Sequence, residues 1–149
     1  MRLRAYRAKD LPTLYEIDHA CFPPGIAYSR TELAGFIGHH LSQTWIAEEE
    51  ESEMITGFLI ATREPRKILH IVTIDVVEAS RRSGVGSLLM DAAEAWAWAN
   101  KLRRIGLETA ENNLGAQRFY EARGYAKIDK LDGYYPNGVA AWVMVKDLS

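Results

Sequence analysis

A turn in the middle of the chain carries the clearest chemical signal. It reads Arg81-Arg82-Ser83-Gly84-Val85-Gly86, after a strand-like segment and before a helix-like one. Glycines at such a turn let a ligand approach the backbone, and the first N–H groups of a helix attract anions. Guanidinium groups add to the binding of phosphate. The turn therefore predicts a phosphate site, with an unliganded tight turn as the alternative.

Two familiar nucleotide loops are excluded at this turn. The G-x-x-x-x-G-K-[ST] loop of nucleoside triphosphatases is absent, and so is the full G-x-G-x-x-G of dinucleotide-binding proteins. The flanking elements are nevertheless well marked. A strand predicted over 67–77 contains "ILHIVTIDVV", apolar on both faces as in a central strand. The helix after Gly84 has a predicted buried stripe of Val85, Leu88, Leu89, Ala92 and Trp96.

Predicted elements in the first half of the chain alternate between strands and helices. A strand over 3–7 precedes a helix that begins near Asp10 and ends at the rigid segment 22–25. Ser29 and Glu32 form a capping box for a second helix that continues to about residue 39. Strands follow over 44–48 and 54–63, and the acidic run from Glu48 to Glu53 is expected to be a solvated turn between them.

The second half of the chain completes an α/β pattern. A strand is predicted over 104–110, a helix over 114–123 that ends at Gly124, and two closing strands over 125–131 and 139–146. The first strands are joined by short turns and the later ones by helices, which favours a mixed sheet with helices on its faces.

Composition limits the class of protein. The 149 residues fit one domain over 1–149, with 48% apolar and 26% charged residues. A net charge of −2 and a pI near 6.1 argue against a nucleic-acid partner. Cys21 is alone, which excludes an internal disulfide and suits a reducing compartment. No apolar run approaches the ~20 residues of a membrane helix, so a cytoplasmic location without a membrane partner is expected.

The turn and the segments around it resemble those of a known family. R-x-x-G-x-G from Arg81 to Gly86 resembles the acetyl-CoA pyrophosphate turn of the GNAT N-acetyltransferases, and "LETAENNLGAQRFYEARGY" over 107–125 resembles that family's strand, asparagine-led helix and tyrosine. Within the family, "ACFPP…YS" over 20–29 and "GYYPNG…AWVM" over 133–144 are similar to the N-terminal protein acetyltransferases, which include the ribosomal-protein-alanine enzymes. The resemblance implies a central mixed sheet of about seven strands with about four helices.

The resemblance also implies a set of residues that bind acetyl-CoA. The backbone of the central strand's end would pair with pantetheine, the turn would hold the pyrophosphate, and the asparagine-led helix would hold the pantetheine arm. In this chain these residues are Ile74, Asp75, Val76, Arg81, Arg82, Ser83, Gly84, Val85, Gly86, Ser87, Asn113, Ala116 and Tyr120. Asn113 is also a good N-cap for its helix.

Acetyl transfer to an amine needs a base. Glu108 lies in the apolar strand segment "IGLETA", where burial would raise its pKa, and it aligns with the glutamate or histidine that relatives use as base. The alternative is a solvated or ion-paired glutamate. His70 aligns with a histidine or tyrosine that orients water or amine; taken alone, it is a hydrogen-bonded core histidine. Regular alternation puts His70 on the face of Val72, Ile74 and Val76, and Asp75 on the opposite face, which makes Asp75 a poor base.

The reaction also needs an acid and an acceptor site. The resemblance implies that Tyr120 protonates the departing thiolate, whereas a core aromatic beside Phe119 is its alternative role. The loops implied to flank the acceptor contain Phe22, Pro23, Tyr28, Tyr134 and Tyr135. An acidic pair usual in the family after the second loop is replaced here by Val139-Ala140-Ala141.

The leading hypothesis is an N-acetyltransferase that uses acetyl-CoA in a ternary complex, by direct attack of a protein or peptide α-amine. A small-molecule amine as acceptor is the second hypothesis, although a polyamine site would need a carboxylate cluster and only Asp129 and Asp132 lie nearby in sequence. A CoA-binding module without turnover is the third. The expected state is a monomer or homodimer, and no metal is expected.

Overall fold

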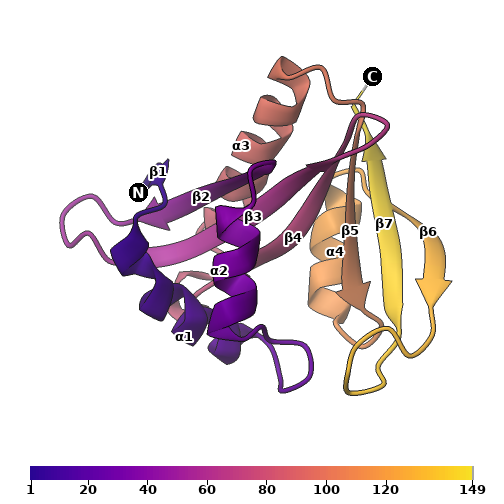
Figure 1. Cartoon of the computed structure of the whole chain (residues 1–149), viewed down its shortest axis with the longest axis horizontal. Coiled ribbons are helices and arrows are strands. Elements are labelled where there is room, and N and C mark those ends of the chain that lie inside the picture. Colours follow the sequence, from indigo (N-terminus) through magenta and orange to yellow (C-terminus); the bar gives the residue numbers. More distant parts are fainter. Residues whose placement is uncertain (149) are drawn as a thin grey trace.

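A computed structural model describes residues 1–148 and contains one seven-stranded sheet with helices on both faces (Figure 1). The strands are β1 (Arg2–Ala5), β2 (Ser42–Glu48), β3 (Ile55–Glu64), β4 (Ile68–Val76), β5 (Arg104–Ala110), β6 (Ala126–Leu131) and β7 (Ala141–Asp147). The α-helices are α1 (Leu11–Cys21), α2 (Arg30–Gly38), α3 (Val85–Ala99) and α4 (Leu114–Ala122), with short 3₁₀ turns η1 (Ala8–Asp10) and η2 (Glu78–Ser80). The predicted mixed α/β fold is confirmed.

Local sequence signals account for the helix ends. Ser29 Oγ accepts the Glu32 N–H at 3.1 Å, and Glu32 Oε1 accepts the Ser29 N–H at 3.0 Å, so the predicted capping box begins α2. Pro12 lies in the first turn of α1, where it needs no intrahelical donor. No helix within residues 1–148 combines the length and the apolar composition that crossing a membrane requires.

The sheet separates two apolar cores. Helices α1 and α2 cover one face, where Phe58 and Ile60 of β3 are fully buried, and α3 lies on the other face against Leu59 and Ala61 (Figure 1). The buried stripe of α3 consists of Val85, Leu89, Met90, Ala93 and Ala97. Of the predicted stripe, only Val85 and Leu89 are buried. The face of α3 that packs on the sheet otherwise lies about one residue further along the chain than predicted.

Strand order explains where a site can form. The order β1-β2-β3-β4-β5-β7-β6 is antiparallel except for the parallel pair β4 and β5. Those two strands pair only from Ile68 to His70, against Arg104 to Gly106, and then diverge (Figure 1). Beyond His70, the edge of β4 that faces β5 has no strand partner among residues 1–148, so its backbone groups are open to a ligand.

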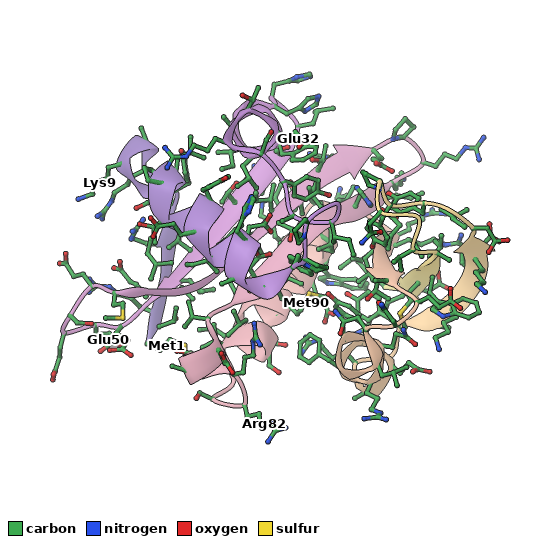
Figure 2. The ribbon with its side chains drawn as sticks, turned by 90° about the horizontal axis from the view of Figure 1, so that it is seen from below. Met1, Lys9, Glu32, Glu50, Arg82 and Met90 are labelled. Atoms are coloured by element: carbon green, nitrogen blue, oxygen red, sulfur yellow. The ribbon has the colours of Figure 1, made fainter. Side chains whose placement is uncertain are left out.

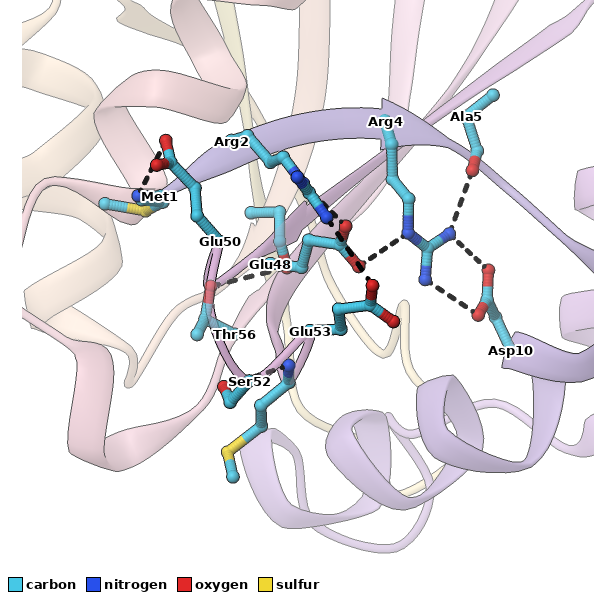
Figure 3. Close-up of polar contacts among 12 residues, drawn as sticks. Met1, Arg2, Arg4, Ala5, Asp10, Glu48, Glu50, Ser52, Glu53 and Thr56 are labelled. Carbon is cyan, nitrogen blue, oxygen red and sulfur yellow. Dashed lines mark hydrogen bonds and ion pairs between the residues drawn. The ribbon is translucent and has the colours of Figure 1, made fainter.

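The start of the sheet is tied by an ion-pair network (Figure 3). Glu48 accepts from Arg2 Nε at 2.9 Å and from Arg4 Nε at 2.7 Å, while Arg4 also donates to both oxygens of Asp10, at 2.8 and 3.0 Å. The prediction that Glu48 belongs to a solvated turn is therefore wrong. Glu48 is a buried strand residue, and the turn follows it. Its two guanidinium partners make this burial possible.

Candidate active site

A cavity of about 790 Å³ opens where β4 and β5 part. Most of the predicted site residues line it: Phe22, Tyr28, Ile74, Val76, Arg81, Arg82, Gly84, Gly86, Ser87, Glu108, Asn113, Ala116, Tyr120, Tyr134 and Tyr135. Five predicted residues do not, namely Pro23, His70, Asp75, Ser83 and Val85; Val85 belongs to the core beneath α3. Because β4 and β5 part, the glycine turn, the strand β5 with Glu108, and both aromatic loops border the same cavity.

The glycine turn presents donors at one end of the cavity. Gly84 is the N-cap of α3 with φ +86°, a conformation that favours glycine, and it provides no capping side chain. The first helical bond joins Leu88 N–H to Gly84 O. Within residues 1–148, the N–H groups before Leu88 in α3 have no acceptor, and the exposed Arg82 side chain extends away from the ribbon (Figure 2). This end suits an anion.

Arg81 and Gly86 have partners within the protein. Arg81 Nε donates to Val76 O at 3.1 Å, and its Nη2 lies 3.5 Å from Cys21 Sγ, so this side chain ties the turn to the end of β4 and to α1. A Cβ on Gly86 would lie 3.3 Å from Phe119 Cζ, so packing of α3 against α4 accounts for this glycine. Of the two arginines, Arg82 is the one whose side chain has no hydrogen-bond or ion-pair partner among residues 1–148.

At its other end the cavity is lined by a carboxylate and a phenol, and an imidazole is hydrogen-bonded to the carboxylate. Glu108 Oε1 lies 2.8 Å from His70 Nε2 and accepts a hydrogen bond from Tyr134 Oη at 3.1 Å. His70 Nδ1 faces Glu64 at 3.6 Å. The Glu108 side chain is 20% exposed, so it is neither solvated nor sealed from the cavity. The two residues predicted as alternative bases therefore form one hydrogen-bonded unit.

This arrangement shifts the ionisation of its members. Burial lowers the pKa of His70, but the hydrogen bond to Glu108 and the charges of Glu108 and Glu64 outweigh it, so the pKa of His70 is raised. Burial and the Glu108 charge raise the pKa of Tyr134 to about 12. A proton on the imidazole is thus stabilised beside the carboxylate, and the phenol stays a hydrogen-bond donor.

Helix α4 carries the predicted acid. Asn113 Oδ1 accepts the Ala116 N–H at 3.2 Å, which confirms the predicted N-cap and places Tyr120 two turns further along the helix. Tyr120 is 8% exposed, packs edge-on against Phe119 and Tyr125, and lines the cavity. Burial, and then the charge of Asp75, raise the pKa of Tyr120, so its hydroxyl stays protonated at neutral pH.

A β-bulge corrects the predicted faces of β4. Ile60 faces Thr73 and Ala61 faces Ile71, so Val72 has no partner of its own on β3. The extra residue inverts the alternation. His70 opposite Thr62 and Asp75 opposite Phe58 consequently lie on the same face, the one covered by α1. Ile74 and Val76 lie on the other face, against the α3 core.

The sequence of residues 11–125 matches the Acetyltransferase (GNAT) family. The chain belongs to the GNAT acetyltransferases. This N-acetyltransferase is 28% identical over 148 residues to an uncharacterised N-acetyltransferase of Methanocaldococcus jannaschii, which covers 98% of the chain and 91% of the relative. It is 25% identical over 161 residues to an N-alpha-acetyltransferase of Sulfurisphaera tokodaii, covering 99% and 93% respectively.

A solved structure shows the same fold. The ribosomal-protein-S18-alanine N-acetyltransferase of Escherichia coli superimposes with a TM-score of 0.87 at 19% identity, covering 99% of the GNAT chain and 94% of the other. The predicted family, fold and enzyme class are therefore confirmed.

Four polar residues near the cavity were not among the predicted site residues. Cys21, Thr73 and Thr109 line it, and Asp18 of α1 is fully buried behind the loop that carries Tyr28. Asp18 lies four residues after the buried Leu14 and so occurs on the apolar face of its helix. A carboxylate on that face was the available sequence signal for a buried acid.

Proposed function

We propose that this GNAT enzyme transfers acetyl from acetyl-CoA to the N-terminal α-amine of a protein or peptide. One observation carries the proposal. A single cavity is lined by an uncapped helix N-terminus with a free arginine at one end and by Glu108 and Tyr134 at the other, with Tyr120 also in its lining and His70 hydrogen-bonded to Glu108.

The residues present fit the cofactor. Unpaired N–H groups at the start of α3, together with Arg82, suit a pyrophosphate, and the unpaired edge of β4 from Ile71 to Val76 suits an extended amide chain such as pantetheine. Asn113 adds a side-chain amide in the cavity lining. Acetyl-CoA supplies an acetyl group activated as a thioester.

The side chains can perform the two proton transfers of direct attack. A neutral amine nitrogen bonds to the acetyl carbon while the carbon–sulfur bond breaks. Glu108, held by His70, takes the proton that the amine loses; an α-amine with a pKa of ~7.7–8.0 makes this easy near neutrality. Tyr120 gives its proton to the sulfur. Its raised pKa means that the hydroxyl still carries this proton at neutral pH.

The acceptor end favours a peptide backbone over a polyamine. Tyr28, Tyr134 and Tyr135 line it and combine apolar rings with hydroxyl groups. Asp129 and Asp132 do not line the cavity, and Asp132 is 90% exposed beside Lys130. The Sulfurisphaera tokodaii relative is named an N-alpha-acetyltransferase, and the Escherichia coli enzyme is named for an alanine of a ribosomal protein; both names support the same acceptor.

Calorimetry with CoA and acetyl-CoA tests the cofactor end. Saturable binding is expected, and Arg82→Ala should weaken it several-fold, because a charge-assisted hydrogen bond is worth about 1.5–3 kcal/mol before solvent screening reduces it. Arg103→Ala removes an equally exposed arginine outside the cavity and serves as control. Absence of any binding by the unmodified protein would overturn the whole proposal.

A panel of acceptors tests the other end. Peptides of varied first residue, the same peptides with blocked α-amines, and small amines including polyamines are each incubated with acetyl-CoA, and products are identified by mass spectrometry. Acetylation of free N-termini alone is the expected result. Turnover of small amines alone would replace the acceptor, and binding of CoA without turnover of any amine would reduce the protein to a binding module.

A further inference from the structure

Two aspartates are buried against each other beside the cavity. Asp18 of α1 is 0% exposed and Asp75 of β4 is 1% exposed. Asp18 Oδ1 and Asp75 Oδ2 are buried without a hydrogen-bond partner among residues 1–148, and side-chain contact with Asp18, as well as its charge, raises the pKa of Asp75. Since carboxylates only accept hydrogen bonds, the contact requires a proton on one of the two oxygens.

The remaining oxygens fix the orientation of both groups. Thr73 Oγ1 donates to Asp75 Oδ1, and the Tyr28 N–H donates to Asp18 Oδ2 at 2.7 Å. Tyr28 is held on its other side as well, because its carbonyl oxygen lies 2.9 Å from His19 Nε2, also in α1. The aspartate contact thus connects the open edge of β4 to the loop that carries Tyr28 at the acceptor end of the cavity.

We propose that Asp18 and Asp75 are positioning residues that share one proton, with Asp75 donating to Asp18, and that this bond holds the acceptor loop against the cofactor strand. The pair carries one negative charge when it holds the proton and two when it does not. Loss of the proton leaves two adjacent carboxylates in a dry site, which breaks the contact and releases the loop.

The surroundings of the pair favour the protonated form. Burial raises the pKa of Asp75 well above its ordinary value, and Asp18 raises it further; Thr73 and the charge of Arg81 oppose this. The other titratable groups near the pair are Cys21 of α1, Tyr120 of α4 and Tyr28. Asp75 raises the pKa of Cys21 and Tyr120, and Asp18 adds to the burial that raises the pKa of Tyr28. Arg81 is the nearby cation, and its guanidinium is bonded to Cys21 and Val76 instead.

Asp75→Asn reproduces the protonated state permanently. Its amide nitrogen can donate to Asp18 Oδ1 while its oxygen still accepts from Thr73. A folded-state pKa above the unfolded value of ~3.9 means that the folded protein retains a proton which the unfolded chain loses, so stability from this group declines as pH rises. The folding equilibrium constant of the native chain should therefore fall, relative to that of Asp75→Asn, by up to about tenfold per pH unit above pH ~4.

Urea unfolding from pH 5 to 9 measures the ratio of the folding equilibrium constants of native chain and variant. Asp132→Asn replaces an exposed aspartate and serves as the control, because its ratio should not change with pH. Infrared spectra of the native chain at neutral pH should contain a carboxylic acid carbonyl band that Asp75→Asn lacks. Asp18→Asn supplies the same hydrogen bond from the other partner and serves if Asp75→Asn does not fold. A flat ratio for the variant, or a native spectrum without the band, would overturn the shared proton.

The positioning role rests on the proposed function and has its own readout. Asp75→Ala should raise the KM for the acceptor by about tenfold, roughly one hydrogen bond, and more than it raises the Kd for CoA; Asp75→Asn should restore it. Equal effects of Ala and Asn on the acceptor KM would contradict this role. Unfolding and infrared measurements need no activity, so failure of the proposed acceptor is distinguishable from failure of the acid pair.

Discussion

Two groups of carboxylates are buried in this fold, and they differ in what surrounds them. Asp10 and Glu48 at the start of the sheet are held by guanidinium groups of Arg2 and Arg4 (Figure 3). Glu108, Asp18 and Asp75 around the cavity have no arginine or lysine partner within residues 1–148; they are held by an imidazole, hydroxyl groups, an N–H group and each other.

This difference separates stabilising acids from reactive ones. Hydrogen bonds from Arg4 lower the pKa of both Asp10 and Glu48, so these groups remain charged and inert. Acids without a cation can gain or share a proton at moderate pH. Substitutions in the first group should therefore change stability and not turnover, whereas substitution of Glu108 should change turnover and leave stability nearly unchanged.

Glu108→Gln should have the largest effect on turnover. Its amide keeps the shape of the side chain but cannot take the amine proton, so kcat should fall by about 10³-fold with little change in the free energy of unfolding. Single-turnover assays and urea unfolding measure the two quantities. Glu111→Gln, in the exposed turn after β5, is the matched control. A variant that keeps most of its activity would remove Glu108 as base.

Tyr120→Phe should lower kcat by about 10²-fold, a smaller effect because a thiolate with a pKa of ~8.5 leaves fairly well without an acid. CoA affinity, measured by calorimetry, should change little. Tyr125→Phe is the control: its hydroxyl donates to Glu94 at 2.8 Å outside the cavity, so its loss should affect stability alone. Equal rates for the native enzyme and Tyr120→Phe would contradict the role of acid.

Arg4→Met tests the cation-balanced group. Both carboxylates lose a charged donor, so unfolding should require about 1.5–3 kcal/mol less free energy at neutral pH, with unchanged kcat per folded molecule. Arg104→Met, whose pair with Asp147 is exposed on both sides, should cost no more than about 1 kcal/mol.

The loss of stability in Arg4→Met should depend on pH in a predictable direction. The pKa of Asp10 is lowered in the folded protein, so its contribution is present above the unfolded value of ~3.9 and is lost as pH falls toward the folded value. The difference between native and Arg4→Met stabilities should therefore shrink below pH ~4. A difference that persists at pH 2 would indicate that lost packing of the arginine, not charge, is responsible.

The sequence predicted most of the helices, strands and caps that position these acids, but few of the side chains that contact them. Capping at Ser29 and Asn113, and the position of Glu108 in a short apolar strand, follow from local residue types. The buried state of Glu48 does not, because it depends on pairing between β1 and β2, residues more than forty apart along the chain.

Asp75 shows the same limit within the site. Strict alternation along β4 assigns it to the wrong face, and the bulge at Val72 that reverses the assignment arises from pairing with β3. Similarly, the insertion of β7 between β5 and β6 brings Tyr134 to Glu108, and no local pattern specifies that order. Long-range register, rather than residue type, decided which acids share a face.

His70→Gln should have the smallest effect, a shift in the pH dependence of kcat. The native pKa of His70 is raised above its ordinary ~6.5, so imidazolium persists near neutrality. Imidazolium stabilises the Glu108 carboxylate and weakens it as a base, so kcat should fall as pH falls through that pKa. Glutamine still donates to Glu108 but does not titrate. Its acid limb should lie at least about one pH unit lower, because no imidazolium forms beside the carboxylate.

Saturating acceptor is needed for this measurement, because kcat then reports ionisations of the bound complex and not the free amine. His39→Gln replaces an exposed histidine outside the cavity and should keep the native profile. Coincident profiles for native enzyme and His70→Gln would show that the imidazole only packs beside Glu108. A displaced profile would show that the cavity carboxylate is tuned by a group that can lose its charge, which Arg4 at the other cluster cannot do.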